Sequence, residues 1–519
     1  MRSTFMGLEA SKRGLTTQQS ALYTTGHNIS NANTAGYTRQ RVNMEPTQGY
    51  PGVGLDTPMT AGFIGTGVQA NSVQRIRDDF TDKQYRQETN KLGYWETRSS
   101  SIAQMEDVLN EPSDYGLAKS LDELWNSLQD LNVNPEDGGA RAVVVQRGIA
   151  VADSFNYMYN SIQQVKENAG AEIGIALTDV NSILQQIASL NEQIQTIEPN
   201  GYMPNDLYDA RDNLLDQLST YLPIEITKQP SGGNAQAIAE GSVNVSLKLK
   251  NGSLVNLVNG RSAAKLQNSG TNTEPDGVTP KGMITGLEVI SPIGLSKTIG
   301  VSELSDLGKY KSLVDSYGYS SNGTEKGLFP DMLNKLNDMA KAFAEEFNAQ
   351  HALGNDITGN RGQDFFAVKD TNSAAGITAA NFHVSKDIIE DPTKIAAAFD
   401  EDLADGQAEP GNGKNALNLA NMKFEALSDL GGVSIQTYFA GVIGQLGVDG
   451  QQAIRLQYNS QTLQQAVTER RSSISSVSLD EEMTNMITFQ QAYNANARMI
   501  TVIDETLDKI INGLGRVGI

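Results

Sequence analysis

The first regular pattern of apolar residues lies near the N-terminus, where large side chains recur at the seven-residue spacing of a coiled coil. Its members are Phe5, Leu8, Leu15, Leu22 and Ile29. Polar residues or glycine fill the alternate positions of the seam, so the stripe is thin. The spacing predicts an amphipathic helix that is weak when alone. Gly26 and Asn28 predict its end, because both accept the backbone conformations that terminate helices.

A second and stronger pattern begins at residue 479 and alternates steps of four and three residues, except for a second consecutive step of three from Ile500 to Ile503. Its members are Leu479, Met483, Met486, Gln490, Tyr493, Ala497, Ile500, Ile503, Leu507 and Ile510. Asp480, Glu481 and Glu482 lie at its start, where negative charge suits the first turn of a helix. The pattern predicts a C-terminal helix that ends near Gly513.

These two stripes are too thin to fill a core alone. Either the end helices pack on a globular body, or they pair with each other as coiled-coil helices and then with other copies of the chain. Residues 14–38 contain no Asp, Glu, Lys or Arg. Because a buried unpaired charge is strongly destabilising, an uncharged flank favours the second interpretation. The two stripes are therefore predicted to form an assembly interface.

The middle of the chain has the spacing of bundle helices. Helical patterns cover residues 78–132, the stripe from Ile173 to Ile197, a shorter segment that ends before Pro223, and residues 331–350. From Val433 the helical pattern continues almost unbroken to the C-terminus. We predict a mainly helical domain of residues 61–223 plus 321–475, with a small mixed insertion at about 352–405. Asp391 with Pro392 predicts a helix start inside that insertion.

Residues 224–320 have a different character. Apolar residues alternate with polar ones from Val243 to Leu249, and a second apolar run begins at Leu254. Asn251-Gly252 between the two runs is a strong hairpin signal. The fold class predicted is therefore mainly α with an inserted β domain. It has paired N- and C-terminal helices (residues 1–60 plus 476–519), a helical-bundle domain and an outer β-rich domain.

Composition narrows the possible functions. The 519 residues carry a net charge of −21, which argues against nucleic acid as a partner, and no apolar run is long enough to span a membrane. The chain contains no cysteine, which excludes disulfides and thiol chemistry. Its start lacks the apolar core of a secretory signal. We expect a protein that stays in the cytoplasm or is exported without a cleaved signal peptide.

No catalytic, cofactor-binding or metal-binding residues are predicted. His27, His351 and His383 are far apart and have no metal-ligand spacing. Residues 356–362 begin like a calcium loop, but Thr358 and Arg361 occupy positions that an EF-hand gives to Asp or Asn and to Gly. A turn fits these residues better. We predict that the protein is not an enzyme and has no cofactor.

Three stretches resemble one bacterial family. Residues 28–37 (NISNANTAGY) resemble the N-terminal signature of flagellar rod, hook and hook-associated proteins. Residues 482–487 (EMTNMI), with Gln490 and residues 493–498 (YNANAR), resemble its C-terminal partner, and residues 63–68 (FIGTGV) resemble a short motif of the same axial proteins. Their order and the presence of both ends identify the chain as a member of this axial family. Its size and the long helical segment after residue 85 favour a hook-associated member.

The resemblance implies a structural, self-assembling protein at the hook–filament junction. It implies an extracellular location after type III export, and order gained on assembly. Implied partners are other copies of the chain, hook protein, the adjacent junction protein and a cytoplasmic export chaperone that binds the C-terminal segment. Nucleic acid and membranes are not expected. Residues implied to shape the turn after the first helix are Asn31, Asn33, Gly36 and Tyr37.

Two alternative functions remain open from the sequence. The chain could be a hook or distal rod subunit of the same family. Alternatively, it could be a hydrolase carried on axial-type ends, with its site in residues 224–405. A coiled-coil adhesin is disfavoured by the two-ended signature.

Overall fold

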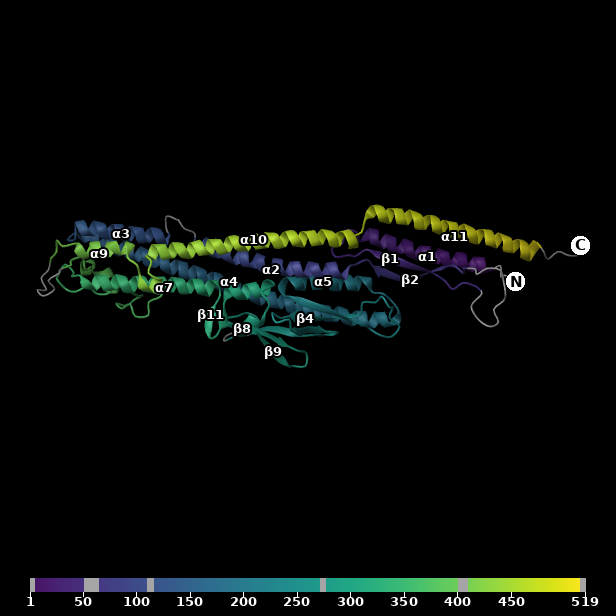
Figure 1. Ribbon diagram of the computed structural model, residues 1–519, viewed down its shortest axis with the longest axis horizontal. Coiled ribbons are helices and arrows are strands. Elements are labelled where there is room, and N and C mark those ends of the chain that lie inside the picture. Colours follow the sequence, from purple (N-terminus) through teal and green to yellow (C-terminus); the bar gives the residue numbers. More distant parts are fainter. Residues whose placement is uncertain (1–4, 51–64, 110–115, 271–276, 400–408, 514–519) are drawn as a thin grey trace, which may run out of the picture.

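The computed structural model shows an elongated molecule in which both chain ends lie at one extremity (Figure 1). The structure describes residues 5–50, 65–109, 116–270, 277–399 and 409–513. A terminal unit is formed by helix α1 (Phe5–Ser30), strands β1 (Gln40–Pro46) and β2 (Val68–Arg75), and helix α11 (Leu479–Gly513). The rest, from Ile76 to Ser475, is called the body.

The body is built on long helices whose bounds follow local signals. They are α2 (Asp79–Val108), α3 (Leu117–Val133), α4 (Gly138–Ile197), α5 (Asn205–Tyr221), α6 (Lys309–Tyr317), α7 (Leu328–Leu353), α9 (Lys414–Asn421) and α10 (Ile435–Ser475). The Asp78 side chain accepts from the N–H groups of Phe80 and Thr81, which caps α2. Most of the stripe predicted from Ile173 to Ile197 is buried along α4, but Leu190 and Ile197 are only half-buried. No helix among the described residues is long and apolar enough to cross a membrane.

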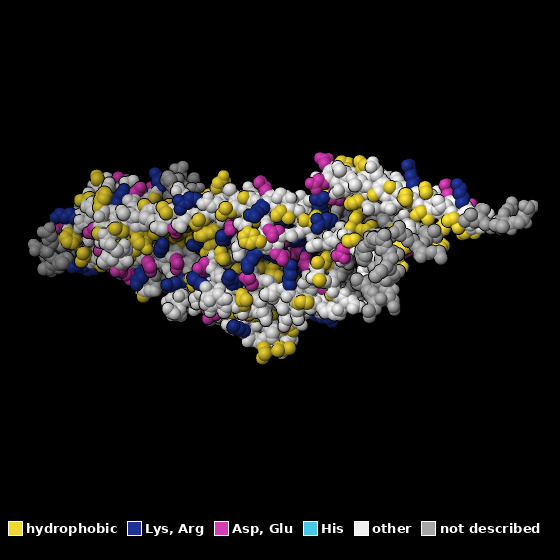
Figure 2. Space-filling model, turned by 45° about the vertical axis from the view of Figure 1, so that its right-hand side comes forward, with side chains coloured by type: hydrophobic (Ala, Val, Ile, Leu, Met, Phe, Trp, Pro, Cys, Tyr) yellow, Lys and Arg dark blue, Asp and Glu magenta, His cyan; other side chains and the backbone are white. Residues whose placement is uncertain are grey.

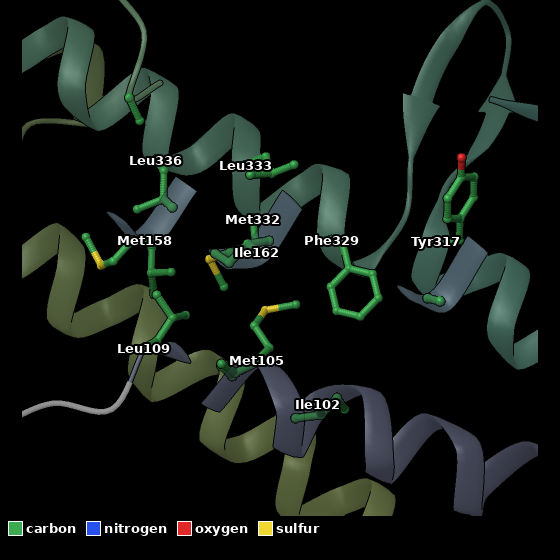
Figure 3. Packing of buried hydrophobic residues seen from close by; sticks show 14 of the residues in the cluster. Ile102, Met105, Leu109, Met158, Ile162, Tyr317, Phe329, Met332, Leu333 and Leu336 are labelled. Carbon is green, nitrogen blue, oxygen red and sulfur yellow. The ribbon is translucent and has the colours of Figure 1, made fainter. Parts of the chain in front are cut away.

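Large apolar side chains fill the space between these helices (Figure 3). α2 contributes Ile102 and Met105, α4 contributes Ile162, and α7 contributes Phe329 and Leu336, all at most 2% exposed. At the end of the body far from the termini, the core contains a cluster of aromatic rings. The rings that contact one another there are Trp125, Phe155, Phe343, Phe347, Phe365, Phe366 and Phe382.

Two sheets form on one side of α4, as the prediction of an inserted β region requires (Figure 1). The first is antiparallel, in the order β3 (Ile224–Gln229), β4 (Ser242–Lys248), β5 (Leu254–Asn259) and β6 (Ser262–Ala263). The second joins β7 (Lys265–Gly270), β8 (Ile284–Ile290), β9 (Ser296–Gly300), β10 (Tyr319–Ser321) and β11 (Thr324–Lys326). The hairpin predicted at Asn251-Gly252 is confirmed: β4 and β5 pair antiparallel, and Gly252 has φ +82°.

The predicted insertion is small and mixed over its described residues, which end at 399. It holds the hairpin of β12 (Phe366–Val368) and β13 (Phe382–Val384), followed by α8 (Lys386–Glu390). The helix start predicted at Asp391 is confirmed, because its carboxylate accepts from Thr393 N. The element is a short 3-10 helix, Pro392–Lys394, rather than an α-helix. Asp356 accepts from the N–H groups of Thr358 and Asn360, which confirms the predicted turn.

One prediction for the terminal unit was wrong. α1 continues through Gly26 and Asn28 and ends at Ser30. The reason is tertiary, because the Asn28 side chain is held by Glu482 and by the backbone of Gln40. The chain turns at residues 31–36, where Gly36 has φ +78°. The mainly helical fold class is confirmed, whereas the division into three domains and the coiled-coil character remain predictions.

Candidate assembly site

α1 and α11 run antiparallel along a seam of small and polar residues. A Cβ atom on Gly7 would lie 3.2 Å from Ile503 Cδ1, and one on Gly14 would lie 2.8 Å from Asn496 Oδ1. At the other end of α1, Asn28 Nδ2 donates to Glu482 Oε2 at 3.1 Å. The contacting pairs therefore advance along α1 as they go back, by the same number of residues, along α11, as antiparallel packing requires. Glycine on one helix lets the second helix approach closely.

An adjacent side of α1 packs on the β1–β2 hairpin. Thr17 Oγ1 donates to Val68 O at 3.2 Å, and a Cβ atom on Gly67 would lie 3.2 Å from the backbone of Ala10. The hairpin is antiparallel, pairs Gln40 with Arg75 and has an irregularity between Asn43 and Met44. One face of α1 thus contacts both α11 and a two-stranded ribbon.

Asn28 is the centre of the turn that follows α1. Its Oδ1 accepts from Gln40 N at 3.0 Å and from the Tyr37 hydroxyl at 2.8 Å, while its Nδ2 also donates to Gln40 O at 2.8 Å. Burial raises the pKa of Tyr37, and the carboxylates of Asp206, Asp209 and Glu482 raise it further. The hydroxyl therefore stays protonated and remains a donor to Asn28.

Arg39 connects this turn to the start of α11. Its Nε donates to Glu482 Oε1 at 2.7 Å, and its NH1 donates to Glu481 Oε2 at 2.6 Å. The Glu482 side chain is 3% exposed and that of Glu481 is 62% exposed. The N-terminal and C-terminal signature stretches, which are far apart in the sequence, therefore contact each other directly.

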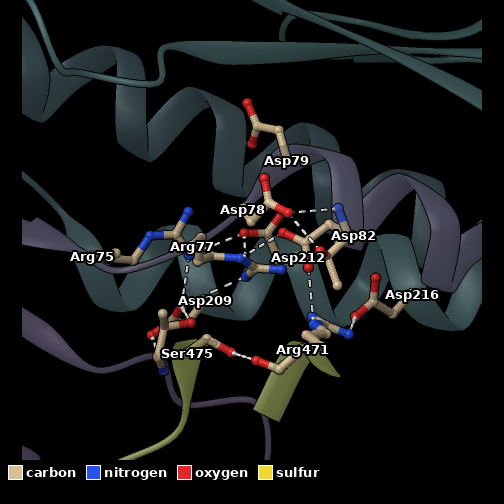
Figure 4. Close-up of polar contacts among 12 residues, drawn as sticks. Arg75, Arg77, Asp78, Asp79, Asp82, Asp209, Asp212, Asp216, Arg471 and Ser475 are labelled. Carbon is tan, nitrogen blue, oxygen red and sulfur yellow. Dashed lines mark hydrogen bonds and ion pairs between the residues drawn. The ribbon is translucent and has the colours of Figure 1, made fainter. Parts of the chain in front are cut away.

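Helix α5 holds the terminal unit against the body through its carboxylates. Asp209 accepts from Thr38 N at 3.0 Å and from Thr38 Oγ1 at 2.6 Å. Arg75 donates to Asp209, Asp212 and Glu240 at 2.6, 3.0 and 2.5 Å. Figure 4 shows Arg75 and Arg77 beside Asp209 and Asp212.

The body side of the same cluster continues to the end of α10. Arg77 contacts Asp82 and Asp212 at 2.8 and 2.7 Å, and Arg471 contacts Asp82 and Asp216 at 2.9 and 2.7 Å (Figure 4). Burial alone would raise the pKa of Asp212, but the surrounding arginines, Arg77 first, hold it well below its usual range. This carboxylate is charged throughout the physiological range.

A hollow of about 540 Å³ opens in the body between α2, α5 and the β3–β4 hairpin. Charged side chains on its lining pair with one another, as Lys83 does with Glu225 and Lys228 with Asp79, both at 3.0 Å. Within the described residues, no group of three or more His, Asp or Glu side chains could hold a metal ion.

Three family models match parts of the chain. The model described as flagellar hook-associated protein FlgK helical domain matches residues 102–366, about half of the chain. The flagella basal body rod protein model matches residues 8–38, and the model of the C-terminal part of the basal body rod FlgEFG proteins matches residues 470–513. The last two cover the two signature stretches.

Full-length similarity decides the family. Flagellar hook-associated protein 1 of Bacillus subtilis is 43% identical to this chain over 520 residues, which is 99% of each protein. The chain belongs to the flagellar hook-associated protein 1 family. The Escherichia coli member is 25% identical over 96% of this chain and 98% of its own length. A solved structure of the flagellar hook junction protein FlgK from Burkholderia pseudomallei has a similar fold, with a TM-score of 0.59 and 15% identity over 76% of this chain and 100% of its own.

In this member of the hook-associated protein 1 family, the predicted interface residues divide into two groups. The half-buried ones are Leu8, Leu15, Leu22, Ile29, Met486, Tyr493, Ala497, Ile500, Ile503 and Leu507. Those exposed in the single chain are Phe5, Leu479, Met483, Gln490 and Ile510. Their role in contacts between copies remains a prediction.

The turn residues have local contacts. Asn31 Nδ2 donates to His27 O at 3.1 Å, and Asn33 is exposed. A Cβ atom on Gly36 would lie 2.0 Å from the Asn213 side chain, and its φ of +78° disfavours any residue with a side chain. The sequence patterns missed the β1–β2 hairpin and the carboxylates of α5. They also missed the exposed residues Ile487, Met499, Val502 and Ile511 on α11. Of the motif at residues 63–68, Phe63 and Ile64 lie outside the described residues.

Proposed function

We propose that this chain is a structural, self-assembling subunit at the junction between flagellar hook and filament. The observation that carries the proposal is the surface of α11. Met483, Ile487, Met499 and Val502 are each about half exposed or more, at 50, 56, 52 and 52%. Exposed apolar side chains along one element are typical of protein interfaces. Hydrophobic side chains lie along this end of the molecule in Figure 2.

The terminal unit has the features of an element completed by its neighbours. The fully buried positions of α1 are small or polar, whereas large apolar side chains of α11 such as Met483 and Ile487 remain exposed. Contacts with other copies and with hook protein would remove them from water. The adjacent junction protein and a cytoplasmic chaperone on the C-terminal segment are the further partners proposed. Export without a cleaved signal peptide to an extracellular site completes the proposal.

Substitution of an exposed residue on α11 tests the assembly face. We expect Met483→Asp and Ile487→Asp to leave the chain folded and exported, but to abolish attachment of filaments to hooks. Tyr157→Asp is the matched control, because Tyr157 is 69% exposed on α4 of the body. Electron microscopy of cells provides the measurement, with the exported chain assayed in the medium. Normal filaments in both α11 variants would contradict the assignment.

Deletion of the gene separates this role from the related ones. If the chain is a junction subunit, cells that lack it should have intact hooks and no filaments. Loss of the hook itself would indicate a hook or rod subunit instead. The amount of free filament protein in the medium provides a second readout, because filament subunits that cannot attach are released.

A further inference from the structure

Two short connections join the body to the terminal unit, and they lie side by side. Residues 76–78 separate β2 from α2, and residues 476–478 separate α10 from α11. Arg39 N donates to Ser475 O at 2.9 Å, and Ile76 N donates to Arg39 O at 2.8 Å, so Arg39, directly before β1, ties the two connections together. No helix or strand of the described residues continues across this joint.

Hydrophobic packing stops at the joint. The continuous core runs from Ile102 to Ala453, and within the described residues it has no member in α1, β1, β2 or α11. The extensive contacts of these four elements are with one another. Burial of apolar area therefore does little to fix the orientation of the terminal unit on the body.

What crosses the joint is polar and concentrated on α5. Asp209 holds Thr38 through two hydrogen bonds and Arg75 through an ion pair. The Arg75 and Asp209 side chains are only 3% and 7% exposed, so solvent screens this pair little. Asn205 Nδ2 adds a hydrogen bond to Val73 O at 2.9 Å. The Arg75 guanidinium also lies 5.0 Å from the centre of the Tyr208 ring.

We propose that this joint is a hinge whose angle is set by the contacts of Asp209 and Asp212 with Thr38 and Arg75. Hydrogen bonds and ion pairs are strong only near one geometry, so their loss removes the preferred angle. The terminal unit itself keeps its shape, because the contacts of Asn28 and Arg39 with Glu482 lie inside it. Copies in one assembly could then present their bodies at different angles. A role of different angles in the assembly rests on the proposed function, whereas the hinge itself does not.

Distance measurements between the two sides of the joint test the proposal. The chain contains no cysteine, so Asn459→Cys on α10 and Asn494→Cys on α11 provide unique sites for spin labels, and both positions are exposed. We expect one narrow distance peak in the otherwise unchanged chain. We expect loss of that peak and a broad distribution in the double variant Asp209→Asn/Asp212→Asn. The matched control is Glu123→Gln, whose carboxylate pairs with Arg147 on the surface of the body and whose peak should stay narrow.

Each outcome decides the question. A narrow peak in the double variant would show that other contacts fix the angle, and a broad distribution in the unchanged chain would show that these charges do not set it. Either result overturns the proposal. Hydrogen exchange of α1 and α11 checks that the unit stays folded.

A second variant covers the case in which the double variant fails to fold. Thr38→Val then serves, because it removes one hydrogen bond to Asp209 without changing the body. A peak as narrow as in the unchanged chain would again overturn the hinge. Met483→Asp alters the assembly face and should leave the peak unchanged, so failure of the proposed function is distinguishable from failure of the hinge.

Discussion

The body buries large side chains, whereas the terminal unit buries small and polar ones. At the far end of the body, Trp125, Phe343 and Phe347 are at most 1% exposed and pack ring against ring. In α1 the buried positions are Gly14, Thr17, Ala21, Thr24, Thr25 and Asn28. Several large apolar residues of the terminal unit, such as Met483 and Ile487, face solvent instead. The body is therefore packed within the single chain, whereas the exposed apolar residues of the terminal unit are the proposed contacts with other chains.

Removal of one aromatic ring from each region is the most direct test of this difference in packing. Phe343 contacts Trp125, Phe347, Phe366 and Phe382, so Phe343→Ala should lower the free energy of unfolding by about 3–5 kcal/mol. Phe5 is 57% exposed, and Phe5→Ala should change the free energy of unfolding by less than about 0.5 kcal/mol. Denaturant unfolding of both variants measures the difference. Equal losses would mean that the terminal unit has a core of its own.

Acid should weaken the body through one buried imidazole. His351 is fully buried, Ala396 N donates to its Nε2 at 2.9 Å, and its Nδ1 lies 2.6 Å from Gln363 O, so the ring is neutral with the proton on Nδ1. Burial lowers the pKa of His351 from 6.5 to about 4. Below pH 6.5 the unfolded state therefore binds the extra proton, and stability falls as the pH falls toward 4, by about 3 kcal/mol.

His351→Gln isolates this effect from the titration of carboxylates. The variant should be less stable than the unchanged chain at pH 7, and the difference between them should shrink as the pH is lowered from 7 to 4. Urea midpoints at several pH values provide the measurement. A difference that is constant with pH would show that His351 has an ordinary pKa in the folded chain.

Local signals predicted much of the body. The stripe on α4 and the Asn251-Gly252 hairpin were predictable because their periodicity or turn chemistry lies within a few residues. The β1–β2 hairpin was not, since a long connection separates the strands and no tight-turn signal marks it. Periodicity also singled out leucines on α1, whereas the seam with α11 follows Gly7, Gly14 and Asn28. Small and polar residues become buried only because a distant helix covers them, and a single stretch of sequence cannot show that.

The joint was least predictable for a related reason. Arg39 and the acidic residues Glu481 and Glu482 were visible in the sequence, but their pairing depends on the antiparallel arrangement of both chain ends. Asp209 and Asp212 were also visible, as polar residues of an ordinary helix. Their role follows from their position on α5 where it faces Thr38 and Arg75.

A bulky residue in the seam should harm the terminal unit and leave the body unchanged. Gly14→Leu places a side chain where Asn496 lies, and should destabilise the α1–α11 pair by about 1–3 kcal/mol. Gly26→Leu is the matched control, because no atom lies within 4 Å of its Cβ position. A better helix former there should stabilise α1 by up to about 1 kcal/mol. Hydrogen exchange of α1 amides measures both, with body amides as the reference, and equal effects would contradict the seam.

The smallest expected difference is between substitutions of Glu481 and Glu482, whose carboxylates both contact Arg39. Glu482 is nearly buried and accepts from both Asn28 and Arg39, so Glu482→Gln should loosen the turn by about 1–3 kcal/mol. Glu481 reaches the same guanidinium from a position that is 62% exposed, and Glu481→Gln should cost about 0–1 kcal/mol. Exchange rates of amides in residues 28–40 provide the measurement. Equal effects of the two substitutions would show that the burial of Glu482 does not strengthen its contacts with Asn28 and Arg39. These contacts would then contribute no more than an ion pair on the protein surface.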